Sequence, residues 1–337
     1  MKNKITKKQK LLEIKNVTEI EGAPFFRPIL MHFAARFIGK SYGEFTSDYK
    51  TLVEANIRCM EYFDTDAVGL ISDPYRETAA FGAKIIFHKN NVPECSKYIV
   101  STMDDLINLK NPDVFKCERT LDRIKGAEEF RKRLGDSVPV IGWIEGPLAE
   151  ACNLVGVSAM LMKTILEPDF ARVLYEKCMI TAKTFALAQI EAGCDVIGIG
   201  DAICSQISAE YYRDDIMPLH QNLVEFIQSK GAQVKLHICG NITHLLPYIK
   251  FVAPDILDID WMVDMNNAFN VLGPDIIRCG NLDPVSVILK SSPRHISKLT
   301  QELIQKEKGR KFILSAGCEI PPDTPHENLR AMRELVY

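Results

Sequence analysis

A short apolar run that ends in a histidine and a cysteine reads Gln233-Val234-Lys235-Leu236-His237-Ile238-Cys239-Gly240-Asn241. Its length and its branched apolar residues predict a buried β-strand over 233–238. Residues two apart in a strand point to the same side, so His237 and Cys239 are predicted to share one side of it. The run therefore predicts both a strand and a pair of side chains that could bind one metal ion.

The chain contains seven further short apolar segments, separated by longer stretches with helical spacing. The eight predicted strands are 28–33, 67–72, 138–144, 195–200, 233–238, 256–260, 276–279 and 311–315. Strands that alternate with helices indicate parallel βαβ units, and eight such units predict a (β/α)8 TIM barrel of the α/β class. Thr46 is predicted to cap the helix that ends before Asp64. We expect one barrel domain over 1–337, with residues 1–25 as an N-terminal helical extension.

The overall composition excludes several classes of protein. The chain has 337 residues, 47% of them hydrophobic, and a net charge of −3, which gives no electrostatic reason to expect nucleic-acid binding. No stretch approaches the roughly eighteen apolar residues needed to span a bilayer. The basic start is not followed by a continuous apolar segment, and ten cysteines are scattered singly, which favours reduced thiols. We expect a cytoplasmic protein with no nucleic-acid or membrane partner.

A third potential metal ligand follows the last predicted strand. In a parallel barrel, the C-terminal ends of the strands open onto one mouth, where active sites are built. Cys318 therefore joins His237 and Cys239 in a predicted zinc site. Three protein ligands leave one coordination position open, which is typical of catalytic zinc, whereas structural zinc is usually held by four. The alternative is that these side chains are buried and inert, as the other eight cysteines are expected to be.

Other polar residues gather at the same predicted mouth. The candidates for binding substrate, or for orienting the metal ligands, are Asp201, Asp260, Asn241, Glu145, Asp73 and His32. A carboxylate at such a position also commonly caps the following loop or helix, so each candidate has a structural alternative. Glu319, next to the third ligand, could approach the metal when no substrate is bound.

Several motifs resemble those of the uroporphyrinogen decarboxylase superfamily of barrels, and within it the zinc-dependent corrinoid methyltransferases of the methylcobalamin:coenzyme M type. The motifs lie at 145–147, 191–197, 236–241, 280–284 and 317–325. The His-x-Cys pair with a late cysteine is the specific part, and the other motifs mark the superfamily. The resemblance implies that His237, Cys239 and Cys318 bind Zn²⁺. It also implies a methyl group passed from methylcobalamin, carried on a separate corrinoid protein, to a zinc-activated small thiol such as coenzyme M or homocysteine.

The departures from the family bear on the alternatives. Decarboxylases of the superfamily grip their substrate with a pair of arginines near the first strand, whereas this chain has His32 and only Arg36 there, although Asp73 falls near the position of their catalytic aspartate. A porphyrinogen decarboxylase is the first alternative, and a corrinoid:tetrahydrofolate methyltransferase is the second. A third is a non-catalytic corrinoid-binding or scaffold protein, but the chain lacks the Asp-x-His-x-x-Gly corrinoid signature. If the acceptor carries a sulfonate, Arg36, Arg76 and Arg278 are its candidate partners.

Overall fold

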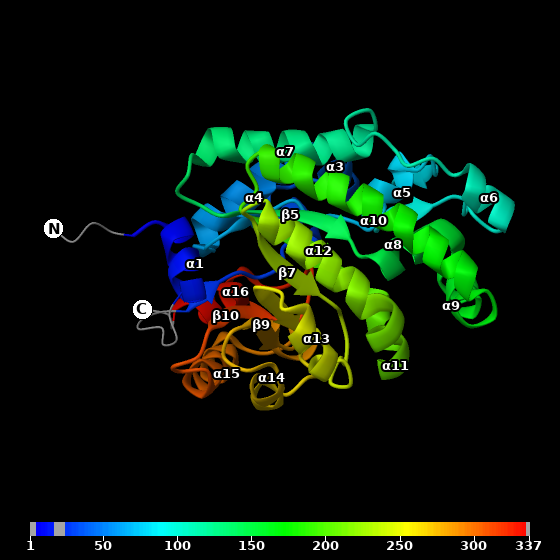
Figure 1. The fold of residues 1–337 in the computed structure, drawn as a ribbon. Coiled ribbons are helices and arrows are strands. Elements are labelled where there is room, and N and C mark those ends of the chain that lie inside the picture. The colour runs from blue at the N-terminus through cyan, green and yellow to red at the C-terminus, as the bar shows by residue number, and fades with distance from the viewer. Residues whose placement is uncertain (1–4, 17–23, 335–337) are drawn as a thin grey trace.

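A computed structural model describes residues 5–16 and 24–334, and it confirms the predicted (β/α)8 barrel (Figure 1). Eight parallel strands form one curled sheet in the order β1-β10-β9-β8-β7-β6-β5-β2. They are β1 (Phe25–Phe26), β2 (Val68–Gly69), β5 (Val140–Glu145), β6 (Val196–Gly200), β7 (Gln233–His237), β8 (Ile256–Ile259), β9 (Ile277–Leu282) and β10 (Phe312–Ala316). The two edges meet where the backbone N–H of Asp66 donates to the carbonyl of Phe26, at 2.8 Å.

Helices surround this sheet, and one of them, α1, closes its N-terminal end. They are α1 (Lys7–Asn16), α2 (His32–Phe37), α3 (Tyr42–Ser47), α4 (Tyr49–Phe63), α5 (Arg76–Ala80), α6 (Met103–Asn108), α7 (Glu118–Leu134), α8 (Pro147–Val155), α9 (Val157–Leu166), α10 (Pro168–Glu191), η1 (Ala202–Gln206), α11 (Ala209–Tyr211), η2 (Tyr212–Ile216), α12 (Met217–Ser229), α13 (Leu246–Val252), α14 (Met265–Leu272), η3 (Pro284–Leu289), α15 (Pro293–Lys306) and α16 (His326–Arg333). A small antiparallel hairpin, β3 (Ile85–Ile86) with β4 (Glu94–Cys95), was not predicted. Among the described residues, no single helix has the length and apolar character to cross a membrane; α8 and α9 reach that threshold only as a pair, across a bend of 110°.

The first strand begins earlier than the sequence pattern predicted. β1 comprises Phe25–Phe26, whereas the predicted segment was 28–33. Pro28 has no N–H to donate to a strand ladder, and beyond it only Ile29 forms an isolated β-bridge. His32, predicted to end the strand, is therefore the first residue of α2.

The predicted cap of the long helix α4 is also wrong by two residues. The cap is Asp48, whose carboxylate accepts hydrogen bonds from the backbone N–H groups of Lys50 and Thr51. Thr46 lies within α3 instead, where its hydroxyl donates to the carbonyl of Gly43. A carboxylate that can reach two free amides at once is a better cap than a hydroxyl already bound elsewhere.

Helix α1 closes the N-terminal end of the barrel, opposite the strand arrowheads in Figure 1. Leu11 and Ile14 complete an apolar cluster with inward-facing strand residues at the bottom of the barrel. Lysines of α1 are paired with carboxylates at or before the starts of strands: Lys7 with Asp64, Lys8 with Asp195, Lys10 with Asp66 and Lys15 with Asp255. The bottom of the barrel is thus a packed core, which leaves the other end for chemistry.

The buried position of Ile14 leads to a prediction about stability. Ile14 is 1% exposed, so Ile14→Ala is expected to lower the free energy of unfolding by about 2–4 kcal/mol, through lost burial and the cavity left behind. Leu12 lies in the same helix but is 46% exposed, so Leu12→Ala serves as the matched control and should change stability by less than about 0.5 kcal/mol. Urea unfolding of both variants measures the difference. Equal effects would show that α1 does not pack into the barrel as described.

Candidate metal centre

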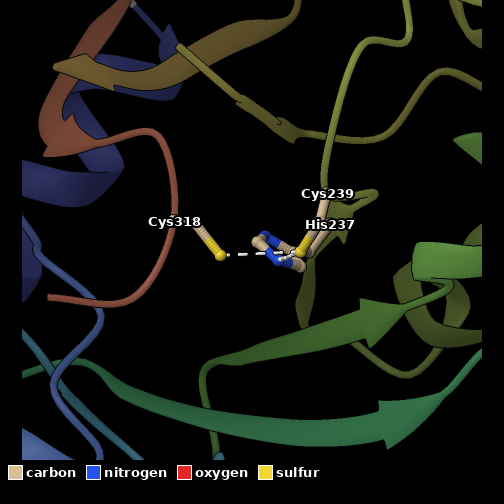
Figure 2. Close-up of side chains that lie close together, drawn as sticks. All are labelled: His237, Cys239 and Cys318. Carbon is tan, nitrogen blue, oxygen red and sulfur yellow. Dashed lines mark hydrogen bonds between the residues drawn. The ribbon is translucent and has the colours of Figure 1, made fainter. Parts of the chain in front are cut away.

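Three side chains with metal-binding atoms meet at the C-terminal mouth of the barrel (Figure 2). His237 is the last residue of β7, Cys239 follows two residues later, and Cys318 lies just after β10. Nε2 of His237 is 2.8 Å from Sγ of Cys239, and the two sulfur atoms are 3.6 Å apart. His237 is buried, whereas both cysteines are partly exposed. The residues predicted to share one ion are therefore together at the mouth.

The spacing of these atoms fits a tetrahedral metal ion with a small adjustment. With zinc–sulfur bonds of about 2.3 Å, two thiolates of a tetrahedral site are about 3.8 Å apart, close to the 3.6 Å between Cys239 and Cys318. An imidazole nitrogen and a thiolate sulfur would be about 3.5 Å apart, so the 2.8 Å contact would lengthen when an ion enters. The sulfur atoms are too far apart for a disulfide, whose bond is about 2.05 Å. One nitrogen and two thiolate sulfurs form a soft donor set that suits zinc.

Asp258 on β8 orients the imidazole, and the sequence patterns did not identify it. Nδ1 of His237 donates to Oδ2 of Asp258 at 2.6 Å, which turns Nε2 toward the cysteines. Nζ of Lys235 also lies 3.0 Å from this carboxylate oxygen. Burial by itself would raise the pKa of Asp258. The positive charge of Lys235 and the contact with His237 outweigh burial and hold that pKa below its ordinary value. A carboxylate in this position fixes the tautomer of a metal-binding histidine and increases its basicity.

The protonation of the three side chains follows from their mutual contacts. Burial would lower the pKa of His237, but hydrogen bonds to Asp258 and Cys318 raise it to about 9. The hydrogen bond from Cys239, with that from His237, lowers the pKa of Cys318, while the same bond and burial raise the pKa of Cys239. Near neutral pH the metal-free cluster therefore holds two protons, on His237 and Cys239, and carries no net charge.

Asp260 lies between the loops that carry the two cysteines. Its carboxylate accepts hydrogen bonds from the backbone N–H of Gly240, at 2.6 Å, and from that of Trp261, at 2.7 Å. Gly317, immediately before Cys318, packs so closely on this loop that a Cβ there would collide with the backbone N of Trp261. Asp260, predicted as a candidate at the mouth, thus positions the loops rather than the imidazole.

Asn241 is hydrogen-bonded within its own loop. Its side-chain oxygen accepts hydrogen bonds from the backbone N–H and the hydroxyl of Thr243, at 3.1 and 2.7 Å. The residue is exposed in the loop after β7. Its contacts are those of a residue that stabilises a turn, the structural alternative to a role in orienting His237.

Asp201 faces away from the mouth. It is fully buried; its carboxylate accepts from the backbone N–H groups of Leu148 and Ala149 in α8 and lies 2.9 Å from Nε2 of His220. The hydroxyl of Tyr212 lies 3.0 Å from the other ring nitrogen of His220. Asp201, Cys204 and His220 form a second group with metal-binding atoms, but the carboxylate and imidazole are already hydrogen-bonded within the protein. Asp201 therefore stabilises the start of α8.

Glu145 and Asp73 lie in buried ion pairs near the mouth. Nη2 of Arg76 donates to Oε1 of Glu145 at 2.7 Å, and burial, reinforced by Glu77, raises the pKa of Glu145 although Arg76 opposes this. Asp73 pairs with Arg119. Burial would raise the pKa of Asp73, but the charges of Arg119 and Arg76 outweigh burial and lower that pKa to about 2. Asp73 is thus an ionised carboxylate held in a fixed position.

His32 is linked to the residue beside the third ligand. Its backbone N–H donates to Oε1 of Glu319 at 2.8 Å, and its Nδ1 lies 3.0 Å from the same oxygen. The ring also stacks on Tyr42, with centroids 3.3 Å apart. Glu319, considered as a residue that could approach the metal, is therefore engaged by His32.

Each of the three candidate arginines for a sulfonate is paired with a carboxylate of the protein. Arg278 is fully buried and bonded to Glu307, and Arg76 is fully buried and bonded to Glu145. Arg36 is exposed and paired with Asp323. None of these three guanidinium groups is free at the mouth.

Comparison with known proteins gives a consistent result over nearly the whole chain. A family model described as "Uroporphyrinogen decarboxylase (URO-D)" matches residues 6–337. A methylcobamide:CoM methyltransferase of Methanosarcina mazei is 29% identical over 244 residues, which cover 72% of this chain and 70% of that protein. A uroporphyrinogen decarboxylase of Trichlorobacter lovleyi is 28% identical over 305 residues, which cover 88% of this chain and 87% of that protein. A solved methyltransferase structure from Methanosarcina mazei has a TM-score of 0.90 and 22% identity, covers 99% of this chain and 98% of that one, and supports the fold.

Proposed function

The chain belongs to the uroporphyrinogen decarboxylase family, and from this premise we propose that it is a zinc-dependent methyltransferase, which moves a methyl group from a methylated corrinoid to a small thiol. The observation that carries the proposal is the convergence of His237, Cys239 and Cys318 on one point at the barrel mouth. Matched relatives include methylcobamide:CoM methyltransferases, whose name pairs this type of donor with a thiol acceptor.

The donor set suits the activation of a thiol. Two thiolates and a neutral imidazole would leave the zinc unit without formal charge, which makes it a weaker Lewis acid than a three-histidine site that activates water. A zinc ion bound there would lower the pKa of a thiol in its open position and leave the sulfur electron-rich enough to attack a methyl group. Coenzyme M and homocysteine both satisfy this chemistry.

The residues around the ligands hold this arrangement in place. Asp258 keeps Nε2 of His237 directed at the mouth, and Trp143 packs its ring edge-on against the imidazole, with centroids 5.7 Å apart. Asp260 holds the loop of Cys239 through a hydrogen bond from the backbone N–H of Gly240, and Gly317, before Cys318, packs closely on Asp260 and Trp261. Contacts that fix the orientation of metal-binding side chains favour metal affinity.

We place the methyl donor on a separate corrinoid protein that docks over the barrel mouth. The chain carries no corrinoid-binding signature of its own, so a tightly bound cobalamin is not expected. Free methylcobalamin should nevertheless serve as a donor at high concentration, because the reacting carbon is the same.

A decarboxylase is the runner-up function, because several matched relatives are named uroporphyrinogen decarboxylase. The fixed, ionised carboxylate of Asp73 favours it, and the presence of Arg36 alone near the first strand, where decarboxylases have two arginines, weighs against a substrate with many carboxylates. Decarboxylation of uroporphyrinogen by metal-free protein would support this function. A corrinoid:tetrahydrofolate methyltransferase is the other alternative, and transfer to the pterin but to no thiol would identify it.

Transfer of the methyl group from free methylcobalamin to a panel of thiols tests the proposal. The panel contains coenzyme M, homocysteine, cysteine and 2-mercaptoethanol, with zinc-loaded and chelator-treated protein assayed in parallel. We expect a change in corrinoid absorbance that requires both zinc and thiol, and detection of the methyl thioether. If zinc-loaded protein demethylates the donor with none of the thiols, the thiol acceptor is wrong.

Zinc binding to the metal-free protein is expected to release about two protons near neutral pH. The metal needs a neutral imidazole and two thiolates, whereas the metal-free cluster holds protons on His237 and Cys239. Titration calorimetry in buffers of different ionisation enthalpy measures this number. Release of fewer than one proton would contradict the protonation described for the cluster.

A further inference from the structure

Three large apolar side chains are exposed in the segments that follow two neighbouring strands of the barrel, β8 and β9. Trp261 is 47% exposed, Met262 48% and Val285 45%. Trp261 and Met262 follow β8, and Val285 follows β9. In the sheet, β8 and β9 lie between β7, which carries His237, and β10, which leads to Cys318. We call these three residues the apolar rim.

The backbone of the apolar rim is fixed against the loops of the ligands. Trp261 donates its N–H to Asp260, and the backbone of Gly317 packs directly on it. The amide of Asn281 donates to the carbonyl of Val263 at 2.8 Å, which holds the far side of the same loop. Asp283 caps η3 by accepting from the backbone N–H of Val285 at 2.8 Å. The rim is thus a defined surface adjoining Cys318, and not the tip of a free loop.

We propose that the apolar rim receives the corrin ring of the methyl donor, with Trp261 as its main contact. The inference rests on the proposed function, because it concerns the donor of that reaction. An exposed tryptophan is unusual, since tryptophan is on average highly buried. Tryptophan is also the residue type most enriched among energetically dominant contacts.

The geometry of methyl transfer requires a contact of this kind. The lone pair of the acceptor sulfur forms the new S–C bond while the Co–C bond breaks, and its electron pair remains on cobalt as cob(I)alamin. The proton of the thiol passes to solvent. Because the attack is in line, the sulfur, the methyl carbon and the cobalt lie on one line. The corrin ring, which surrounds the cobalt, then lies across the mouth of the barrel. Its edge then reaches the residues that flank Cys239 and Cys318, and an indole provides a flat apolar face for it.

A polypeptide is the competing occupant of this surface, and free methylcobalamin distinguishes the two. Equilibrium dialysis of methylcobalamin in the absence of thiol, where no transfer takes place, measures binding of the corrin alone. We expect saturable binding by the zinc-loaded wild type, weakened at least about tenfold by Trp261→Ala and by less than about threefold by Trp261→Phe, which keeps an aromatic face. Phe251 is 65% exposed at the end of α13, away from the mouth, so Phe251→Ala should leave binding unchanged.

Steady-state kinetics with free methylcobalamin give a second readout. Trp261→Ala should raise KM for methylcobalamin at least about tenfold and change kcat at saturating donor by less than about twofold. Equal methylcobalamin affinity of Trp261→Ala and wild type, or no saturable binding by the wild type, overturns the inference.

The failure of the inference and the failure of the proposed function are distinguishable. Methyl transfer to a thiol with unchanged donor binding in Trp261→Ala leaves the function standing and removes the role of the rim. Binding of methylcobalamin that is sensitive to Trp261, without transfer to any thiol, supports the rim and contradicts the thiol acceptor.

Discussion

Replacing Cys239 with alanine is expected to abolish both zinc binding and methyl transfer. Cys239 supplies one of two thiolates, and its sulfur is 2.8 Å from Nε2 of His237 and 3.6 Å from Sγ of Cys318. With two ligands left, the site should retain less than about a tenth of an ion per chain after dialysis. A bound metal contributes several kcal/mol to transition-state stabilisation, so the rate should fall at least about a thousandfold. Zinc content by atomic emission and the rate of methylcobalamin demethylation measure the two effects.

A second cysteine variant controls for the loss of a thiol as such. Cys95 lies in the β3–β4 hairpin, is partly exposed and donates to the carbonyl of Lys97. Cys95→Ala should keep full zinc content and full activity. An active Cys239→Ala variant, or one that keeps its zinc, would contradict the assignment of Cys239 as a ligand.

Replacing Asp258 with alanine is expected to weaken zinc binding by about 10- to 100-fold and also to destabilise the fold. The imidazole of His237 loses the partner that fixes its orientation. Lys235, which is 2% exposed, loses the carboxylate at 3.0 Å and becomes a buried unpaired cation, which costs about 3–5 kcal/mol. Competition with a zinc chelator measures the first effect, and urea unfolding of the metal-free protein the second.

A double variant separates these two consequences of losing Asp258. The double variant Asp258→Ala with Lys235→Met has no unpaired buried lysine. Its free energy of unfolding should therefore recover most of what Asp258→Ala alone loses. Zinc affinity should stay low, because His237 is still without its partner. Asp275 is an exposed aspartate before β9, and Asp275→Ala should change neither quantity. If the double variant regains tight zinc binding, Asp258 acts on stability alone.

The contribution of Asp258 to stability also has a defined pH dependence. Its folded-state pKa is held below the ordinary value of about 3.9, so its ionised form is favoured in the folded protein. The stability it provides is fully present above that ordinary value and is lost as the pH falls through the lower, folded-state pKa. Near neutral pH, Asp258 stays ionised.

The strand that carries the first two ligands was predictable because its pattern is local. The alternation of Lys235, His237 and Cys239 on one side of the chain follows from the two-residue period of a strand, and β7 (Gln233–His237) lies within the predicted segment. The approach of Cys318 follows only once the barrel is assumed, since β7 and β10 are separated by two other strands. The third ligand is therefore predictable only through the fold.

The two-residue period of a strand also explains the direction of Asp201 and the contact of Asp258 with His237, which the sequence patterns did not identify. Gly200 pairs with His237 and shares its inward direction, so Asp201, one residue later, points outward to α8. The position of Asp201 at the end of a strand does not by itself indicate which way its side chain points. Asp258 was missed because it lies inside a strand, although the pairing of Leu236 with Leu257 places it beside His237 and would have indicated the contact.

The surroundings of Glu145 and Asp73 depend on contacts that no local pattern encodes. Glu145 pairs with Arg76 in α5, and Asp73 pairs with Arg119 in α7. Each arginine is distant in sequence from the carboxylate with which it pairs. The packing of α5 and α7 against the barrel brings these pairs together. Sequence alone gave the location of the acids but not their partners.

X-ray absorption at the zinc edge, recorded before and after addition of the acceptor thiol, tests the central claim most directly. The protein should bind one zinc through one nitrogen from His237 and two sulfurs at about 2.3 Å from Cys239 and Cys318, with a light-atom ligand in the fourth position. Addition of the thiol should raise the number of sulfur ligands from about two to about three. An unchanged sulfur count in the presence of a thiol that is methylated, or a site closed by four protein ligands, would contradict the account.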